Sequence, residues 1–187
     1  MPAVKGATVI GKFEDASVDP LSGVAVEMPA LDLVAHWRRC GMSADFLAGY
    51  MAYDYANRPV ATNVLSTVIN EILENAAKFS ADKRCQVRIA VTQHGDSVCV
   101  EASNATSPDR AESFRKCLEE VLNVDAEELF RRHLESAPSA PPGAPGVGLV
   151  VLRKDYGADL GVRITPRADG LFEVTVQVRI SAEEVDQ

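Results

Sequence analysis

The chain has 187 residues, of which 47% are hydrophobic and 25% charged, and its formal net charge at pH 7 is −8. This length fits one domain with a small extension, the hydrophobic content excludes global disorder, and the acidic balance argues against a nucleic-acid partner. The four cysteines show no CxxC spacing and the sequence has no apolar run of about 20 residues, which indicates a cytoplasmic protein that does not enter a membrane.

The N-terminal part begins with two strand-like runs, residues 7–13 and 24–28, separated by the turn-rich stretch 15–23. This pattern predicts either a hairpin or strands added at a sheet edge. A helix is expected over residues 30–39, ending at Gly41 in the position after the last turn that glycine favours.

A second helix is expected over residues 44–57, with Ser43 as its cap and its end before Pro59. Several large apolar side chains gather on it: Phe46, Leu47, Tyr50, Met51 and Tyr53. Core packing explains them, and the alternative is a surface for a partner or for a homodimer.

The most informative segment is the helix predicted over residues 61–79. Glu71, Asn75 and Lys78 fall on one face of it. The neighbouring face is apolar and consists of Val68, Ile69, Ile72, Leu73, Ala76 and Phe79. A carboxylate, an amide oxygen and a cation in this arrangement could hold a metal-bound polyphosphate, whereas a solvated face with a Glu74–Lys78 pair is the alternative.

The next elements are a hairpin and two helices. Residues 87–91 and 98–102 alternate around a Gly-Asp turn, which predicts antiparallel strands. Ser107 and Pro108 then open a helix, and residues 125–128 resemble a capping box at the start of another. A Pro-rich stretch over 137–146 indicates a loop.

The C-terminal part contains a glycine turn and a second hairpin. Gly146, Gly148 and Leu149 lead into a helix over about 148–156, and a glycine turn before a helix presents backbone N–H groups to an anion. Strands are expected over 160–166 and 171–180, and the acidic tail is expected to fray from Ser181. Antiparallel strands with helices laid on one face predict an α+β two-layer sandwich.

This order of elements resembles the GHKL or Bergerat fold of histidine kinases and gyrase-type ATPases. The resemblance implies that Asn75 binds Mg²⁺, that Lys78, Gly146, Gly148 and Leu149 lie beside the phosphates of ATP or ADP, and that Glu71 is a general base. It also implies an ATP lid over 107–145 within a domain at 59–181, which follows an N-terminal extension at 1–58 and precedes an acidic tail at 182–187.

The adenine-binding motif DxGxG of that family is altered. The alternation of the second hairpin strand leads to Asn104, followed by Ala105 and Thr106, so an amide replaces the aspartate and both glycines are absent. Asn104 and Thr106 remain candidates for contact with the base, because an amide oxygen can accept from the adenine amino group. Without the glycines, side chains occupy space that the backbone should leave for the ligand.

Two further motifs resemble small stand-alone bacterial GHKL-like regulators related to SiaB-type and anti-sigma kinases. They are the run from His36 to Leu47, with its W-R-x-x-G-M-S-A-D-F pattern, and the run from Gly146 to Ala158. The resemblance implies a signalling regulator that acts through protein–protein interaction with weak or absent ATP binding. The alternative is an active Mg²⁺-ATP-dependent serine/threonine kinase. The implied partner is a small signalling protein such as an anti-sigma-factor antagonist.

Overall fold

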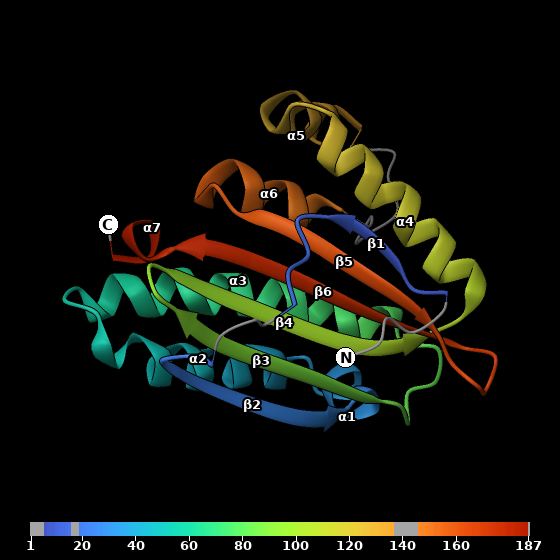
Figure 1. The fold of residues 1–187 in the computed structure, drawn as a ribbon, viewed down its shortest axis with the longest axis horizontal. Coiled ribbons are helices and arrows are strands. Elements are labelled where there is room, and N and C mark those ends of the chain that lie inside the picture. Colours follow the sequence, from blue (N-terminus) through green and yellow to red (C-terminus); the bar gives the residue numbers. More distant parts are fainter. Residues whose placement is uncertain (1–5, 16–18, 137–145, 187) are drawn as a thin grey trace.

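A computed structural model describes residues 6–15, 19–136 and 146–186. Within these residues, six strands form one antiparallel sheet in the order β1-β5-β6-β4-β3-β2 (Figure 1). The strands are β1 (Thr8–Gly11), β2 (Ser22–Pro29), β3 (Gln86–His94), β4 (Ser97–Thr106), β5 (Asp159–Pro166) and β6 (Phe172–Ser181). Both predicted hairpins, β3–β4 and β5–β6, are confirmed.

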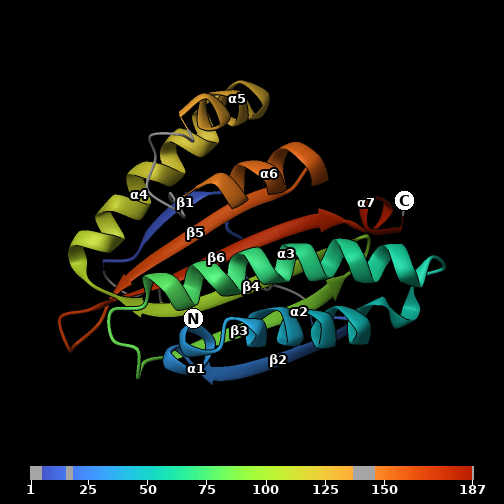
Figure 2. The same cartoon turned by 180° about the vertical axis from the view of Figure 1, so that it is seen from behind.

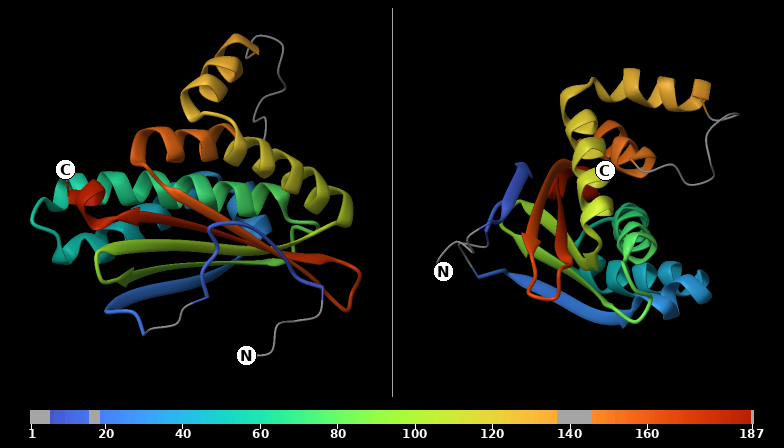
Figure 3. Two further views of the ribbon diagram at one scale, coloured as in Figure 1. Left: turned by 45° about the horizontal axis from the view of Figure 1, so that its top comes forward. Right: turned by 90° about the vertical axis from the view of Figure 1, so that its right-hand side faces the viewer.

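The helices lie on one face of this sheet, as the view from behind and the tilted view show (Figures 2 and 3). They are α1 (Ala30–Ala35), α2 (Arg38–Met51), α3 (Arg58–Phe79), α4 (Pro108–Asn123), α5 (Ala126–Ser136), α6 (Val147–Tyr156) and α7 (Ala182–Asp186), with a 3₁₀ turn over Ala52–Asp54. The predicted α+β two-layer sandwich is therefore confirmed. No helix among the described residues combines the length and the hydrophobicity needed to cross a bilayer.

Helix α3 occupies the centre of the helical layer. Its buried residues recur at the spacing of one helix face, and Val68, Ile69, Ile72 and Leu73 are at most 1% exposed. Pro59 lies in the first turn, where its missing N–H is not needed, so the helix begins earlier than predicted. Burial of this stripe against the sheet fixes which face of α3 is left for polar chemistry.

The N-terminal strands are edge additions and do not pair with each other. β1 pairs with β5 and β2 pairs with β3, at opposite edges of the sheet. The chain after β1 crosses the face of the sheet that carries no helices (Figure 1). There Gln177, 4% exposed, accepts from the Glu14 N–H and donates to the Glu14 carbonyl, both at 3.0 Å.

The predicted boundary between the first two helices is wrong. α1 ends at Ala35, and α2 already begins at Arg38, so Gly41 and Ser43 lie inside a helix and terminate or cap nothing. Cys40 and Ala44 are fully buried one turn apart, and their burial against the core outweighs the low helix propensity of a single glycine.

The predicted fraying from Ser181 is also wrong. α7 follows β6 directly, Val185 is fully buried, and the Asp186 carboxylate accepts a 2.8 Å hydrogen bond from the Asn57 N–H. The predicted boundary at residue 58 remains a prediction, although β2 belongs to the same sheet as the later strands. Residues 137–145 of the predicted loop and lid lie outside the described residues.

The predicted starts of α4 and α5 are confirmed. The Ser107 hydroxyl accepts from the Arg110 N–H at 3.4 Å, and the Asp125 carboxylate accepts from the Glu128 N–H at 3.0 Å. Each cap satisfies a backbone donor that the first turn of a helix leaves free.

Candidate functional site

A pocket opens between α3, α4 and the ends of β4 and β6. The space inside it that a water molecule can occupy is only about 20 Å³, which is far below the roughly 300–1,000 Å³ of small-molecule sites, so its walls must move apart before a base could enter. Three of the predicted site residues, Asn75, Asn104 and Thr106, line it together. Its other walls are Ala76, Phe79, Arg110, Phe114, Val174 and Val176.

Each polar side chain is placed by the element that carries it. Asn104 and Thr106 follow the inward alternation of β4, whose earlier inward residues form the core. The Thr106 hydroxyl donates to the Phe79 carbonyl at 2.7 Å, which joins the end of β4 to the end of α3. Arg110, in the first turn of α4, donates to the Ser80 carbonyl at 2.9 Å.

Asn104 is the unusual residue of this pocket. It is only 6% exposed, and its Nδ2 has no hydrogen-bond partner among the described residues. A buried donor left unpaired costs about 1–3 kcal/mol. A ligand that carries a hydrogen-bond acceptor and enters this pocket would relieve that cost.

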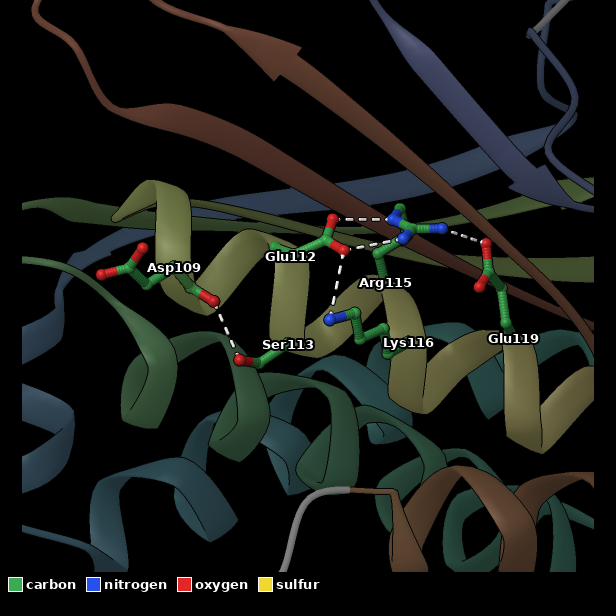
Figure 4. A network of polar contacts seen from close by, with 6 residues as sticks. All are labelled: Asp109, Glu112, Ser113, Arg115, Lys116 and Glu119. Carbon is green, nitrogen blue, oxygen red and sulfur yellow. Dashed lines mark hydrogen bonds and ion pairs between the residues drawn. The ribbon is translucent and has the colours of Figure 1, made fainter.

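Lys78 does not line this pocket but a neighbouring hollow of about 260 Å³. The two spaces share Phe79, Arg110 and Phe114, so Lys78 and Arg110 place positive charge beside the mouth of the first pocket. Along α4, Arg115 forms ion pairs with Glu112 and Glu119 (Figure 4).

Glu71 lies one turn before Asn75 on α3, against the first turn of α6. A Cβ placed on Gly148 would be 2.0 Å from Glu71 Oε2, so the carboxylate fills the space that the glycine leaves open. Burial, and then the negative charge of Glu74, raise the pKa of Glu71. The carboxylate thus occupies the end of α6 that attracts anions.

The glycine turn itself is closely packed. Gly146 has a φ of 99°, a conformation that favours glycine, and a Cβ there would be 2.7 Å from Cys117 Sγ of α4. Leu149 is 2% exposed and packs in the hydrophobic core. The site residues therefore form two groups along α3, with Asn75 near the pocket and Glu71 at the glycine turn.

Two pocket residues, Arg110 and Phe114, were not predicted from the sequence. The helix start at Ser107-Pro108 places Arg110 in the first turn of α4, close to the end of β4, so its position near the pocket could have been predicted. Nothing in the sequence distinguishes Phe114 from an ordinary core residue. The described residues contain no group of three or more His, Cys, Asp or Glu side chains that could hold a metal. Mg²⁺ at Asn75 would therefore depend on phosphate oxygens and water for its other ligands.

Comparison with known proteins gives a likeness among the solved structures. The sequence matches no protein-family model and no curated protein. A chain in the crystal structure of the SiaB–SiaC complex from Pseudomonas aeruginosa superimposes with a TM-score of 0.62 and 16% identity, over 84% of this chain and 89% of that chain. At this identity the likeness shows a shared fold.

Proposed function

We propose that this chain is a signalling regulator of the GHKL type, which acts by binding a small protein and binds ATP weakly or not at all. The observation that carries the proposal is the Glu71 carboxylate packed against Gly148. In the GHKL arrangement this turn faces the phosphates of the nucleotide, and here it already faces a negative charge.

The electrostatic cost of adding phosphates at this turn is considerable. Two like charges about 4 Å apart repel by about 4 kcal/mol at the effective dielectric of a protein surface. Either the Glu71 side chain leaves its position or its carboxyl group takes up a proton before a polyphosphate can approach. The net charge of −8 adds a long-range penalty for the same ligand.

The likeness to a chain of a two-protein complex supports a function in protein–protein interaction. The partner that fits the proposal is a small signalling protein such as an anti-sigma-factor antagonist. We include a homodimer in the proposal, because α2 exposes large apolar side chains that the fold does not use.

The pocket favours a second candidate function, a Mg²⁺-ATP-dependent serine/threonine kinase. Asn75, Asn104 and Thr106 line one pocket. The unpaired Nδ2 of Asn104 could donate a hydrogen bond to an acceptor such as a ring nitrogen of adenine. In that function Glu71 would take the proton of the attacking hydroxyl, and Asn75 would hold Mg²⁺.

Calorimetric titration of Mg²⁺-ATP and Mg²⁺-ADP into the wild type, Asn75→Ala and Glu71→Gln distinguishes the two functions. The regulator predicts that the wild type binds nucleotide no more tightly than millimolar, and that Glu71→Gln binds it more tightly. Micromolar binding by the wild type that disappears in Asn75→Ala would support the kinase instead. Binding of purified anti-sigma-factor antagonist proteins from the source organism, without nucleotide, tests the partner.

A further inference from the structure

A short acidic segment crosses the sheet face that carries no helices and adds no residue to the core. It consists of Lys12–Asp15, which follows β1, and we call it the strap (Figure 1). None of its four residues is buried in the core, and neither is any residue of β1. A segment of this kind separates from the protein at a lower free energy than the strands beneath it, because few apolar contacts hold it.

Four residues of β5 and β6 form the surface on which the strap lies. Gly161 is opposite Gln177 in the register of the two strands, and Arg163 and Arg179 each follow one of them by two residues. All four therefore share one face of the sheet. A Cβ on Gly161 would be 2.5 Å from the Lys12 carbonyl carbon, so the backbone of the strap can approach only because this residue is glycine.

Gln177 binds the backbone of the strap and not its side chains. Its Oε1 accepts from the Glu14 N–H and its Nε2 donates to the Glu14 carbonyl, both at 3.0 Å. Every residue except proline carries this donor and this acceptor, and an extended chain presents them to its surroundings. The contact therefore selects an extended backbone and no particular sequence.

The two arginines add a preference for an aromatic ring and two acids. Arg179 pairs with the Glu14 carboxylate at 3.0 Å. Arg163 pairs with the Asp15 carboxylate and lies over the Phe13 ring, 4.2 Å from its centroid. The two carboxylates are 65% and 83% exposed, whereas the arginines are 25% and 31% exposed. The cations thus belong to the sheet surface, and exposed acids reach them from outside through ion pairs that are individually weak.

We propose that these four sheet residues form a binding site for an extended acidic segment of a partner protein, and that the strap occupies this site as an intramolecular competitor. The partner segment has an aromatic residue followed by two carboxylates, because this is the chemistry that the site binds in its own chain. It binds as an added extended chain, by displacing the strap. The inference rests on the proposed function only in that the partner is a protein.

The strap lowers the affinity for the partner. A ligand that binds only the molecules in which the strap is open has its apparent affinity reduced by the fraction of those molecules. Any change that opens the strap without altering the four sheet residues therefore strengthens binding of the partner segment.

Binding of a labelled peptide to the full chain tests the proposal. The probe has the sequence of residues 6–15 and carries fluorescein, and fluorescence anisotropy at low salt measures its dissociation constant. The double variant Glu14→Lys, Asp15→Lys reverses both acids of the strap and leaves the four sheet residues unchanged. We expect it to bind the peptide at least about tenfold more tightly than the wild type, because its own strap no longer competes. Both positions are exposed, and circular dichroism checks that the variant folds.

Three controls identify the site and the chemistry. Asp54→Lys, Glu183→Lys changes the net charge by the same amount at exposed positions outside the strap, and it should bind the peptide like the wild type. Adding Arg163→Ala and Arg179→Ala to the strap variant should weaken its binding at least about tenfold. A peptide with alanine at positions 13–15 should be equally weak.

Three results would overturn the proposal. They are equal binding by the strap variant and the charge-matched control, wild-type binding as tight as that of the strap variant, and binding that persists without the two arginines. Each would leave the proposed function standing, because the peptide takes the place of the partner. The titrations with nucleotide and with anti-sigma-factor antagonist proteins test that function separately.

Discussion

The contact between Glu71 and the first turn of α6 can be tested without any ligand, by the substitution Gly148→Ala. The new Cβ would lie 2.0 Å from Glu71 Oε2, so the carboxylate must rotate away. Displacing a packed side chain in this way costs about 1–3 kcal/mol. The backbone at Gly148 has no positive φ, so alanine itself gains about 0.5–1 kcal/mol by restricting the unfolded chain. We expect a net loss of about 1 kcal/mol in the free energy of unfolding.

The sign of the effect should reverse when Glu71 is removed. In a Glu71→Ala background nothing obstructs the new methyl group, so Gly148→Ala should stabilise the protein by about 0.5–1 kcal/mol. Gly41→Ala is the matched control, because a Cβ there meets no atom within 4 Å, and we expect stabilisation in both backgrounds.

Urea denaturation followed by circular dichroism measures the four free energies of this double-mutant cycle. The coupling between positions 71 and 148 should be about 1.5–2 kcal/mol. If Gly148→Ala has the same effect with and without the Glu71 carboxylate, the contact does not exist in solution. In that case no carboxylate would keep phosphates away from this turn.

Three further predictions concern the pH dependence of stability, the contact of Lys12 with β5, and the pocket. Because burial and Glu74 raise the pKa of Glu71, the folded state binds the proton more tightly than the unfolded state. The free energy of unfolding should therefore fall as pH rises from about 4.3 through the folded pKa, and Glu71→Gln should flatten this fall in urea titrations; parallel profiles would contradict it. Gly161→Ala places a Cβ 2.5 Å from the backbone of Lys12 and should cost about 2–3 kcal/mol, so an unchanged urea midpoint would refute that contact. Asn104→Leu removes an unpaired buried amide and should stabilise the fold by about 1 kcal/mol while lowering any nucleotide affinity; a loss of thermal stability would argue against the unpaired donor.

Local chemistry explains the elements that were predicted correctly. The alternation in β3 and β4, the cap at Ser107 and the apolar periodicity of α3 each depend on residues close in sequence. The break between α1 and α2 was predicted at the wrong place, because contacts with residues distant in sequence determine it. Gly41 satisfies a local rule for ending a helix, and the burial of Cys40 and Ala44 against distant residues overrides it.

The sequence by itself determined the layers of this protein and the polar face of α3, because hydrophobic periodicity reports burial wherever a helix or strand has one buried side. It placed Asn75, Asn104 and Thr106 as candidates for one site, and the pocket contains all three. Only the tertiary structure decided what faces the glycine turn. Whether Glu71 points to a ligand or to Gly148 depends on the distance between α3 and α6, which the packing of the whole helical layer on the sheet fixes.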